Sequence, residues 1–387
     1  MVDDMLRTLA VENYRSLRHL VVPLSGLTVV TGANGTGKSS VYRSLRLLAE
    51  ASLGGATTAL AKEGGLSSTL WAGPEHLSLG MRVGSVPVQG TRGSTPVGLR
   101  LGFAADELSY SVEFGLPGPT GPTMFSLDPE IKVESVWSGT TLRPGSLQTE
   151  RRGPAVRVRD SAGEWMHHPY RVRPYDSILS EFSDPETTPE LMALREQLRS
   201  WRFYDHVRTD ADAPARRPAP GTRTTVLPPD GSSLAAALQT VREIGTGLDE
   251  AIDRGFPGSR LTVTDNDGWF GLALSQPGML RPLAASELSD GTVRYLLWVA
   301  ALLSPRPPDL LVLNEPETSL HPDLTEPLAE LIADAATRSQ VVVVTHSERL
   351  ADALSQGSRI ELFKSTGQTK VANQGALDEP AWSWPKR

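Results

Sequence analysis

Near both ends of the chain, short runs of apolar residues alternate with longer segments in which apolar residues recur at helical spacing. The short runs are bounded by turn residues and have the length of strands, and several are rich in branched side chains. This alternation is typical of an α/β fold whose core sheet is mostly parallel. The predicted strands are Leu6–Glu12, Leu27–Thr31, Leu310–Leu313, Gln340–Thr345 and Ile360–Phe363, and the predicted helices are Ser40–Ala51, Ser289–Leu303, Thr325–Ala336 and Glu348–Leu354.

The middle of the chain has a different pattern. Short alternating runs from Leu77 to about Val136, separated by glycine and proline, predict an antiparallel β subdomain. Three stretches rich in small residues or in proline and arginine predict irregular structure: residues 53–75, 143–175 and 209–230. Between and after them we expect helices at Pro189–Trp201 and Leu234–Ile244 and strands near Arg260–Thr264 and Trp269–Leu274.

An insertion therefore interrupts the α/β pattern. We expect an N-terminal lobe at residues 1–140, a small mixed insertion at 141–258, and a C-terminal lobe at 259–387 that completes the core. No heptad repeat is sustained, so the sequence does not predict a long coiled coil.

Composition narrows the class of protein. The 387 residues include no cysteine, which excludes a disulfide framework, a thiolate nucleophile and a cysteine–zinc site. A net charge of −7 disfavours a uniformly basic nucleic-acid binder, although local basic patches remain compatible with one. No apolar run reaches the ~20 residues that span a bilayer, and the N-terminus lacks a signal-peptide core. We therefore expect a cytoplasmic protein without a membrane partner.

A glycine-rich stretch follows the predicted strand Leu27–Thr31. It reads Gly32-Ala33-Asn34-Gly35-Thr36-Gly37-Lys38-Ser39 and matches the phosphate-binding pattern G-x-x-x-x-G-K-[ST]. The glycines let backbone N–H groups turn toward phosphate oxygens, the lysine reaches the β- and γ-phosphates, and the serine hydroxyl can bind Mg²⁺. A helix begins next, so its N-terminal dipole favours the same phosphates. A glycine-rich hairpin that matches by chance is the alternative.

Three further stretches carry candidate chemistry. Ser289-Asp290-Gly291 opens a predicted helix and can form a second phosphate site, although a serine there is more often only an N-cap. Glu315 follows the strand Leu310–Leu313, at the end of a strand where open α/β sheets bind ligands. His346 ends a neighbouring strand, where a single histidine is usually structural but can contact a γ-phosphate.

The order of these four stretches resembles that of ABC-type ATPases of the RecF/SMC branch, and in particular of stand-alone ATPases with an EPETSLHP-like segment. The resemblance covers residues 1–52 and 286–364 and includes Asn13-Tyr14-Arg15-Ser16, which is similar to an N-terminal segment of that branch. It implies a P-loop NTPase fold like that of ABC and SMC head domains. It also implies ATP and Mg²⁺ as cofactors and a homodimer with ATP sites shared between the protomers.

The resemblance also implies roles for individual residues. Lys38, Glu315 and His346 match the catalytic positions: Glu315 polarises the attacking water, and His346 is the switch histidine. Thr318–His321 match the segment that communicates across the dimer. The ATP-binding positions are Arg15, Gly32, Asn34, Gly35, Thr36, Gly37, Lys38, Ser39 and Ser40, together with Ser289 and Gly291 from the opposite protomer.

One position departs from the family pattern. Asn314 stands where the strand usually ends in an aspartate that helps to hold Mg²⁺, while Ser39 matches the direct metal ligand. An amide can orient a water of the hydrated cation but adds no charge. The glutamine that usually completes the metal site is not assigned, and Gln89 and Gln148 both stay open as candidates.

Three functions remain open. The first is a DNA-associated ATPase in DNA repair or in defence against foreign DNA, with contacts from arginines in residues 143–173 and 208–223. The second is an ATP-driven switch for a separately encoded protein such as a nuclease or a toxin, because this chain carries no nuclease motif. The third, the ATP-binding subunit of a membrane transporter, is disfavoured by the Ser-Asp-Gly-Thr stretch and by the large middle insertion.

Overall fold

The computed structural model describes residues 4–73, 98–118, 124–160, 162–182, 184–205, 207–375 and 378–386. Within these ranges the chain divides into two compact units, each discontinuous in sequence. The first unit comprises residues 26–31 and 202–359, and the second comprises residues 4–25, 32–201 and from 360 onward. The expected division into segments 1–140, 141–258 and 259–387 stays a prediction.

The first unit contains a parallel sheet in the order β10-β15-β16-β3. All four strands have runs of branched or aromatic residues, and the residues of β16 are fully buried, as expected when helices cover both faces. Because the strands are parallel, their carboxyl ends meet at one edge of the sheet. The strands are β3 (Leu27–Gly32), β10 (Arg202–Tyr204), β15 (Leu310–Asn314) and β16 (Gln340–Val344).

Helices of the first unit bury their apolar residues in one core with these strands. Helix α9 is apolar on nearly every side and is almost wholly buried, while α10 buries one stripe of residues. The helices are α7 (Leu234–Ile244), α8 (Leu248–Gly255), α9 (Asp290–Leu302), α10 (Thr325–Ala335) and α11 (Glu348–Ala353), with short 3₁₀ turns η1 (Pro214–Arg216), η2 (Ala285–Glu287) and η3 (Pro322–Leu324).

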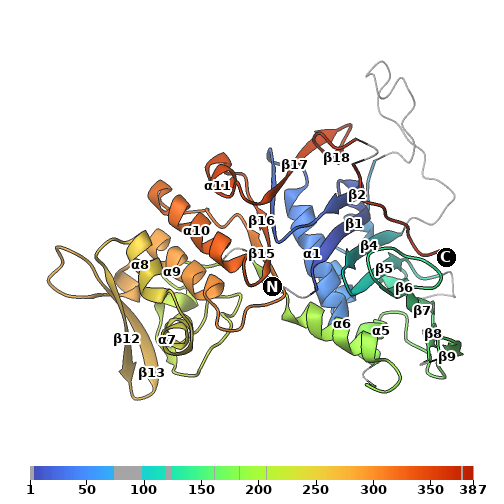
Figure 1. Ribbon diagram of the computed structural model, residues 1–387, viewed down its shortest axis with the longest axis horizontal. Helices are drawn as coiled ribbons and strands as arrows, with labels where there is room; N and C mark the ends of the chain where they lie inside the picture. The colour runs from blue at the N-terminus through green and yellow to red at the C-terminus, as the bar shows by residue number, and fades with distance from the viewer. Residues whose placement is uncertain are drawn as a thin grey trace. The chain divides into compact units, whose positions relative to one another are not determined.

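A small antiparallel sheet belongs to the same unit (Figure 1). Its long strands pair across a turn at Asp267-Gly268, where both residues have positive φ. The strands are β11 (Ala219–Pro220), β12 (Arg260–Asn266), β13 (Trp269–Ser275) and β14 (Leu283–Ala284).

The second unit is built on an antiparallel sheet in the order β2-β1-β4-β5-β6-β7-β8-β9. Figure 1 shows its strands following one another from the β1–β2 hairpin to β9. The strands are β1 (Leu6–Tyr14), β2 (Leu17–Pro23), β4 (Leu99–Ala105), β5 (Leu108–Gly115), β6 (Glu130–Ser138), β7 (Leu147–Arg152), β8 (Ala155–Arg159) and β9 (Trp165–His167).

Helix α1 is the longest helix in the described part of the chain, with 15 residues, and most of its side chains are buried. It packs against α2, α5 and α6 of the same unit. The helices are α1 (Lys38–Ser52), α2 (Ala56–Lys62), α3 (Leu66–Thr69), α5 (Ile178–Glu181) and α6 (Pro189–Ser200); β17 (Ser358–Ser365) and β18 (Gln368–Val371) form a hairpin whose paired residues lie in this unit.

The structure confirms the α/β class, the parallel core strands and the antiparallel β subdomain, and it shows no long coiled coil within the described ranges. The part of the expected subdomain before Gly98 lies outside those ranges. Two predictions of irregular structure were wrong. Residues 53–75 contain α2 and α3, because alanines and leucines there outweigh the glycines. Residues 143–175 contain β7, β8 and β9, whose arginines are paired rather than loop-forming.

Candidate functional site

The phosphate-loop motif folds into a turn between β3 and α1. Lys38 is 5 % exposed, and its ammonium donates to the carbonyl oxygens of Gly32 at 2.6 Å and Ala33 at 3.1 Å. The Thr36 hydroxyl donates to the same Ala33 carbonyl at 2.8 Å. The lysine therefore holds the loop closed from inside, while Ser39 lies exposed in the first turn of α1.

Two loop glycines meet different surroundings. Gly37 has a φ of 106°, and a Cβ built there would lie 2.3 Å from the Thr369 hydroxyl oxygen. Gly35 has a φ of 75°, and a Cβ there would meet nothing within 4 Å. Only the first therefore needs glycine for space as well as for backbone conformation.

Thr369 of β18 connects this loop to the β1–β2 turn in the same unit. Its hydroxyl donates to the Thr36 carbonyl at 2.6 Å and lies 2.8 Å from the Ser16 hydroxyl, and its N–H donates to the Ser16 carbonyl at 2.9 Å. The phosphate loop is thus fixed by a residue more than 300 positions away, since the Thr36–Thr369 separation is 333 residues.

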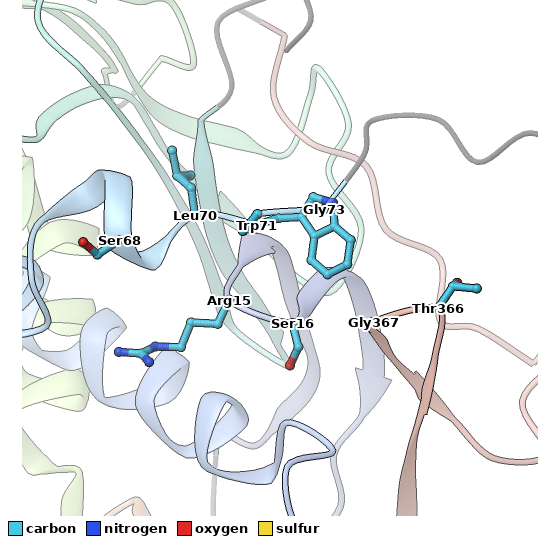
Figure 2. A pocket seen from close by; sticks show the side chains of 9 residues that line it. Arg15, Ser16, Ser68, Leu70, Trp71, Gly73, Thr366 and Gly367 are labelled. Carbon is cyan, nitrogen blue, oxygen red and sulfur yellow. The ribbon is translucent and has the colours of Figure 1, made fainter. Parts of the chain in front are cut away.

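Beside this connection lies a cavity of approximately 590 Å³. Figure 2 shows the Trp71 ring in it, with the Thr366–Gly367 turn on one side. The ring covers Gly73 closely, because a Cβ on that glycine would lie 2.0 Å from Trp71 Cζ2. The cavity thus joins an aromatic face to the turn that precedes Thr369, the residue that hydrogen-bonds to the phosphate loop. Its lining residues are Arg15, Ser16, Ser68, Leu70, Trp71, Ala72, Gly73, Thr366 and Gly367.

Arg15 has an unusual backbone and a local partner. Its φ of 51° at the tip of the β1–β2 hairpin is uncommon for a residue with a side chain. Its guanidinium bonds Glu63 Oε2 at 2.6 Å, and Figure 2 shows the side chain extending away from Trp71. Burial alone would lower the pKa of Arg15, but the carboxylate of Glu63 outweighs it and raises that pKa. Glu63 therefore holds the guanidinium that the family resemblance assigns to phosphate.

In the first unit, two carboxylates and a histidine gather at the carboxyl ends of β15 and β16. His346 Nδ1 lies 3.6 Å from Glu315 Oε1 and 3.5 Å from Glu317 Oε1. Glu317 is held further by the Thr345 hydroxyl, which donates to Oε1 at 2.5 Å, and its side chain is only 10 % exposed. Glu315 has a φ of 49°, and its N–H donates to the Val344 carbonyl at 2.7 Å. Such strain at a carboxylate is typical of functional sites.

Asn314 and Glu317 each keep one oxygen without a donor. Asn314 Oδ1 and Glu317 Oε2 are buried and have no hydrogen-bond partner among the described residues. Buried acceptors are normally satisfied, so these two fit a site completed by a hydrated cation or by water. No cluster of three acidic or histidine side chains in the described ranges could hold a metal by itself. The two buried oxygens fit a hydrated Mg²⁺, whose waters would donate to them.

Ser289 caps α9, since its hydroxyl accepts from the Thr292 N–H at 3.2 Å. The side chain is exposed, so capping leaves it accessible. A Cβ on Gly291 would lie 3.0 Å from the carbonyl oxygen of Ser319, whose φ is 64°. The predicted signature and the predicted dimer-communication segment are therefore neighbours within the first unit.

Most arginines of the two expected basic loops are used within the fold. Arg151 is fully buried on Glu134, and Arg216 is buried on Asp290 and three carbonyl oxygens. Others pair with nearby carboxylates: Arg152 and Arg157 with Glu150, Arg173 with Asp176, Arg208 with Asp210, Arg217 with Asp212, and Arg223 with Glu243. Much of the positive charge that motivated DNA contact is therefore already neutralised.

Each unit holds part of the predicted site. The second unit contains the phosphate loop from Gly32 to Ser40 and Arg15, and the first contains the signature, Asn314, Glu315 and His346. Of the two candidate glutamines, Gln148 lies half-buried on β7 and donates to the Ser138 hydroxyl, and Gln89 lies outside the described residues.

Sequence reasoning missed three residues: Asp205, Glu317 and Trp71. Asp205 directly follows β10, and an acid after a strand is the signal that identified Glu315. Glu317 stands in the same Glu-Pro-Glu segment. Trp71 gave no signal, because only the tertiary fold brings it to the β1–β2 turn.

Comparison with solved structures places the fold. The chain is similar to an Smc head bound to the C-terminal winged-helix domain of ScpA, with 14 % identity, a TM-score of 0.50, and coverage of 95 % of this chain and 96 % of that one. A Pyrococcus furiosus Smc head with an extended coiled coil, bound to the C-terminal domain of ScpA, gives 12 % identity, a TM-score of 0.50, and coverage of 95 % and 96 %. An SMC head from Thermotoga maritima has 14 % identity and a TM-score of 0.44, and the match covers 96 % of this chain and 99 % of that one. The first two show an SMC-head-like fold.

Sequence comparison gives the family. No curated protein matches the chain. None of the helices in the described ranges is both long and apolar enough to cross a membrane. Residues 27–352 match the family described as "AAA domain, putative AbiEii toxin, Type IV TA system". The match spans most of the chain, from the strand before the phosphate loop to α11, and the chain belongs to this family of ABC/SMC-like ATPase domains.

Proposed function

We propose that the protein binds ATP with Mg²⁺, hydrolyses it in a homodimer, and uses the cycle as a conformational switch. The observation that carries this proposal is the pair of Glu315 and His346 at the ends of adjacent parallel strands. Their neighbour in that sheet, β3, leads directly into the phosphate loop. A carboxylate, an imidazole and a phosphate loop at strand ends fit phosphoryl transfer to water.

The phosphate loop binds the nucleotide in this proposal. Backbone N–H groups from Gly32 to Ser40 surround the phosphates, with Asn34 and Thr36 at the loop tip. Lys38 leaves the carbonyls of Gly32 and Ala33 for phosphate oxygens, a stronger partner for an ammonium. The cavity at Trp71 accepts the base, since aromatic faces stack on bases. Arg15 then exchanges part of its bond with Glu63 for phosphate.

At the carboxylate edge, Glu315 orients the attacking water and takes its proton. His346 lies within 3.6 Å of that carboxylate and contacts the γ-phosphate as a switch. Ser39 and, through water, Asn314 would hold Mg²⁺, which supplies charge neutralisation for the phosphates when bound. Ser289 and Gly291 bind the γ-phosphate of the partner protomer, which makes hydrolysis conditional on dimerisation.

The target of this switch that we favour is a separately encoded protein. Two observations support it: the expected DNA-contacting arginines are largely paired internally, and the family description names a toxin system. An Smc head of the same fold was solved with a protein partner. Association with DNA, in repair or in defence against foreign DNA, is the second candidate. DNA affinity that rises with ATP and falls with salt would support it.

The primary test is Glu315→Gln. Removal of a general base should lower ATP hydrolysis by at least about 100-fold, while ATP binding and ATP-dependent dimerisation persist. Glu326→Gln, which removes an exposed charge from the first turn of α10, is the matched control and should hydrolyse ATP normally. Wild-type turnover by Glu315→Gln would refute the role of Glu315.

Sharing between protomers has its own test. Lys38→Ala and Ser289→Arg homodimers should both be inactive, whereas mixed dimers should regain one working site. Mixed dimers that form but stay inactive would contradict the shared site.

A further inference from the structure

Asp205 lies beside Asn314 at the edge of the parallel sheet. Strands β10 and β15 are parallel, with Tyr204 opposite Leu313, so the next residue of each strand comes into the same row. Asn314 Nδ2 donates to Asp205 Oδ1 at 2.7 Å. Both side chains are partly buried, which strengthens a hydrogen bond to a charged acceptor.

This contact fixes the orientation of the amide. An ionised carboxylate only accepts hydrogen bonds, so the NH₂ group of Asn314 must face Asp205. The carbonyl oxygen then points away from Asp205. That oxygen is buried and has no partner among the described residues. A donor such as a water of a hydrated cation would satisfy it, and the sequence places Asn314 where the family resemblance implies a metal-binding aspartate.

We propose that Asp205 supplies the negative charge of the Mg²⁺ site that Asn314 lacks. The inference rests on the proposed ATPase function. Asn314 acts as the oriented acceptor, and Asp205 polarises it and provides the charge from the neighbouring strand. The role that a single aspartate has in the family is thereby shared by two hydrogen-bonded residues, Asp205 and Asn314. A residue that hydrogen-bonds to a metal-binding side chain orients that side chain and tunes its basicity.

A purely structural role for Asp205 is the competing explanation. Asp205→Asn separates the two, because an asparagine side-chain oxygen can still accept the bond from Asn314 while the charge is lost. Asp212→Asn is the matched control: it removes one charge from the same segment at a side chain that is 80 % exposed.

The experiment measures Mn²⁺ binding to the full chain by the loss of the free-ion EPR signal, with the β,γ-imido analogue of ATP bound. Asp205→Asn should weaken Mn²⁺ binding about 10- to 100-fold, as changes behind metal ligands typically do. Affinity for the analogue in EDTA should stay unchanged, and Asp212→Asn should behave as wild type. The double variant Asp205→Asn/Asn314→Asp returns the charge to β15 and should restore Mn²⁺ binding.

Each outcome decides the inference. Wild-type Mn²⁺ affinity in folded Asp205→Asn overturns it and leaves the ATPase proposal standing. A wild-type protein that fails to bind the analogue with Mn²⁺ present overturns both. If Asp205→Asn does not fold, the double variant carries the test: wild-type Mn²⁺ affinity supports the inference, and weak affinity in the folded double variant refutes it.

Discussion

The phosphate loop and the carboxylate edge satisfy their polar groups in different ways. In the loop, the lysine and the threonine hydroxyl bond carbonyls a few residues away, and Thr369 completes the arrangement. At the edge, the equivalent partners come from other strands, and Asn314 Oδ1 and Glu317 Oε2 still have none among the described residues. The buried side-chain groups of the loop are thus satisfied within their own unit, whereas two buried side-chain oxygens at the edge have no donor among the described residues.

This difference predicts how each region responds to substitution. A preformed loop depends on shape, so loss of space should damage it most. At the edge, function depends on the charge and orientation of the side chains. Substitutions that keep the shape of a side chain but remove its charge should therefore lower activity without unfolding the protein.

The largest effect should come from Gly37→Ala. The added Cβ would lie 2.3 Å from the Thr369 hydroxyl oxygen at a φ of 106°, so the loop must move. We expect loss of measurable ATP binding by calorimetry and a lower melting temperature. Gly35→Ala is the matched control, because its φ is also positive but its Cβ would meet nothing within 4 Å; it should cost only about 1 kcal/mol of stability. Equal effects of the two alanines would contradict the spatial explanation.

An intermediate effect is expected for Glu317→Gln. The amide oxygen can still accept from Thr345, but the charge near His346 is lost, so His346 and Glu315 should be positioned less well. Single-turnover hydrolysis should slow by about tenfold, a modest share of what a positioned acid or base contributes. ATP affinity should not change. A variant with weaker binding and normal turnover would show that Glu317 serves the nucleotide rather than the chemistry.

The smallest effect concerns the turn before Ser289. A side-chain hydrogen bond from Arg281 and one from the Ala284 N–H lower the pKa of Glu287 to about 2. The contribution of this carboxylate to the free energy of unfolding is fully present above its ordinary pKa of 4.5. It is lost as the pH falls through about 2. Arg281→Gln should raise that pKa toward 4.5, as an NMR titration would show. An unchanged value would mean that the backbone contact alone sets it.

The sequence predicted the loop better than the edge, for a physical reason. Gly32 to Ser39 form a local structure whose contacts are mostly a few residues apart, so its pattern carries its geometry. Asp205 reaches Asn314 only because β10 pairs with β15, a separation of 109 residues that no local pattern records. The strands in residues 143–175 were missed for another reason: their many arginines and prolines predicted a loop, but the arginines pair with carboxylates of the same sheet, as Arg151 does with Glu134, 17 residues away.

The pairing of β3 with β16 has a consequence for synthesis of the chain. Val30 pairs with Val344, so the strand that leads into the phosphate loop waits for residues made more than 300 positions later. At about 5 to 20 residues per second, that interval is roughly 15 to 60 s. During it the apolar residues of β3 lack their β16 partner on the ribosome, and non-local pairing of this kind folds slowly. Folding of the nascent protein therefore depends on keeping β3 from pairing with other strands until β16 has been made.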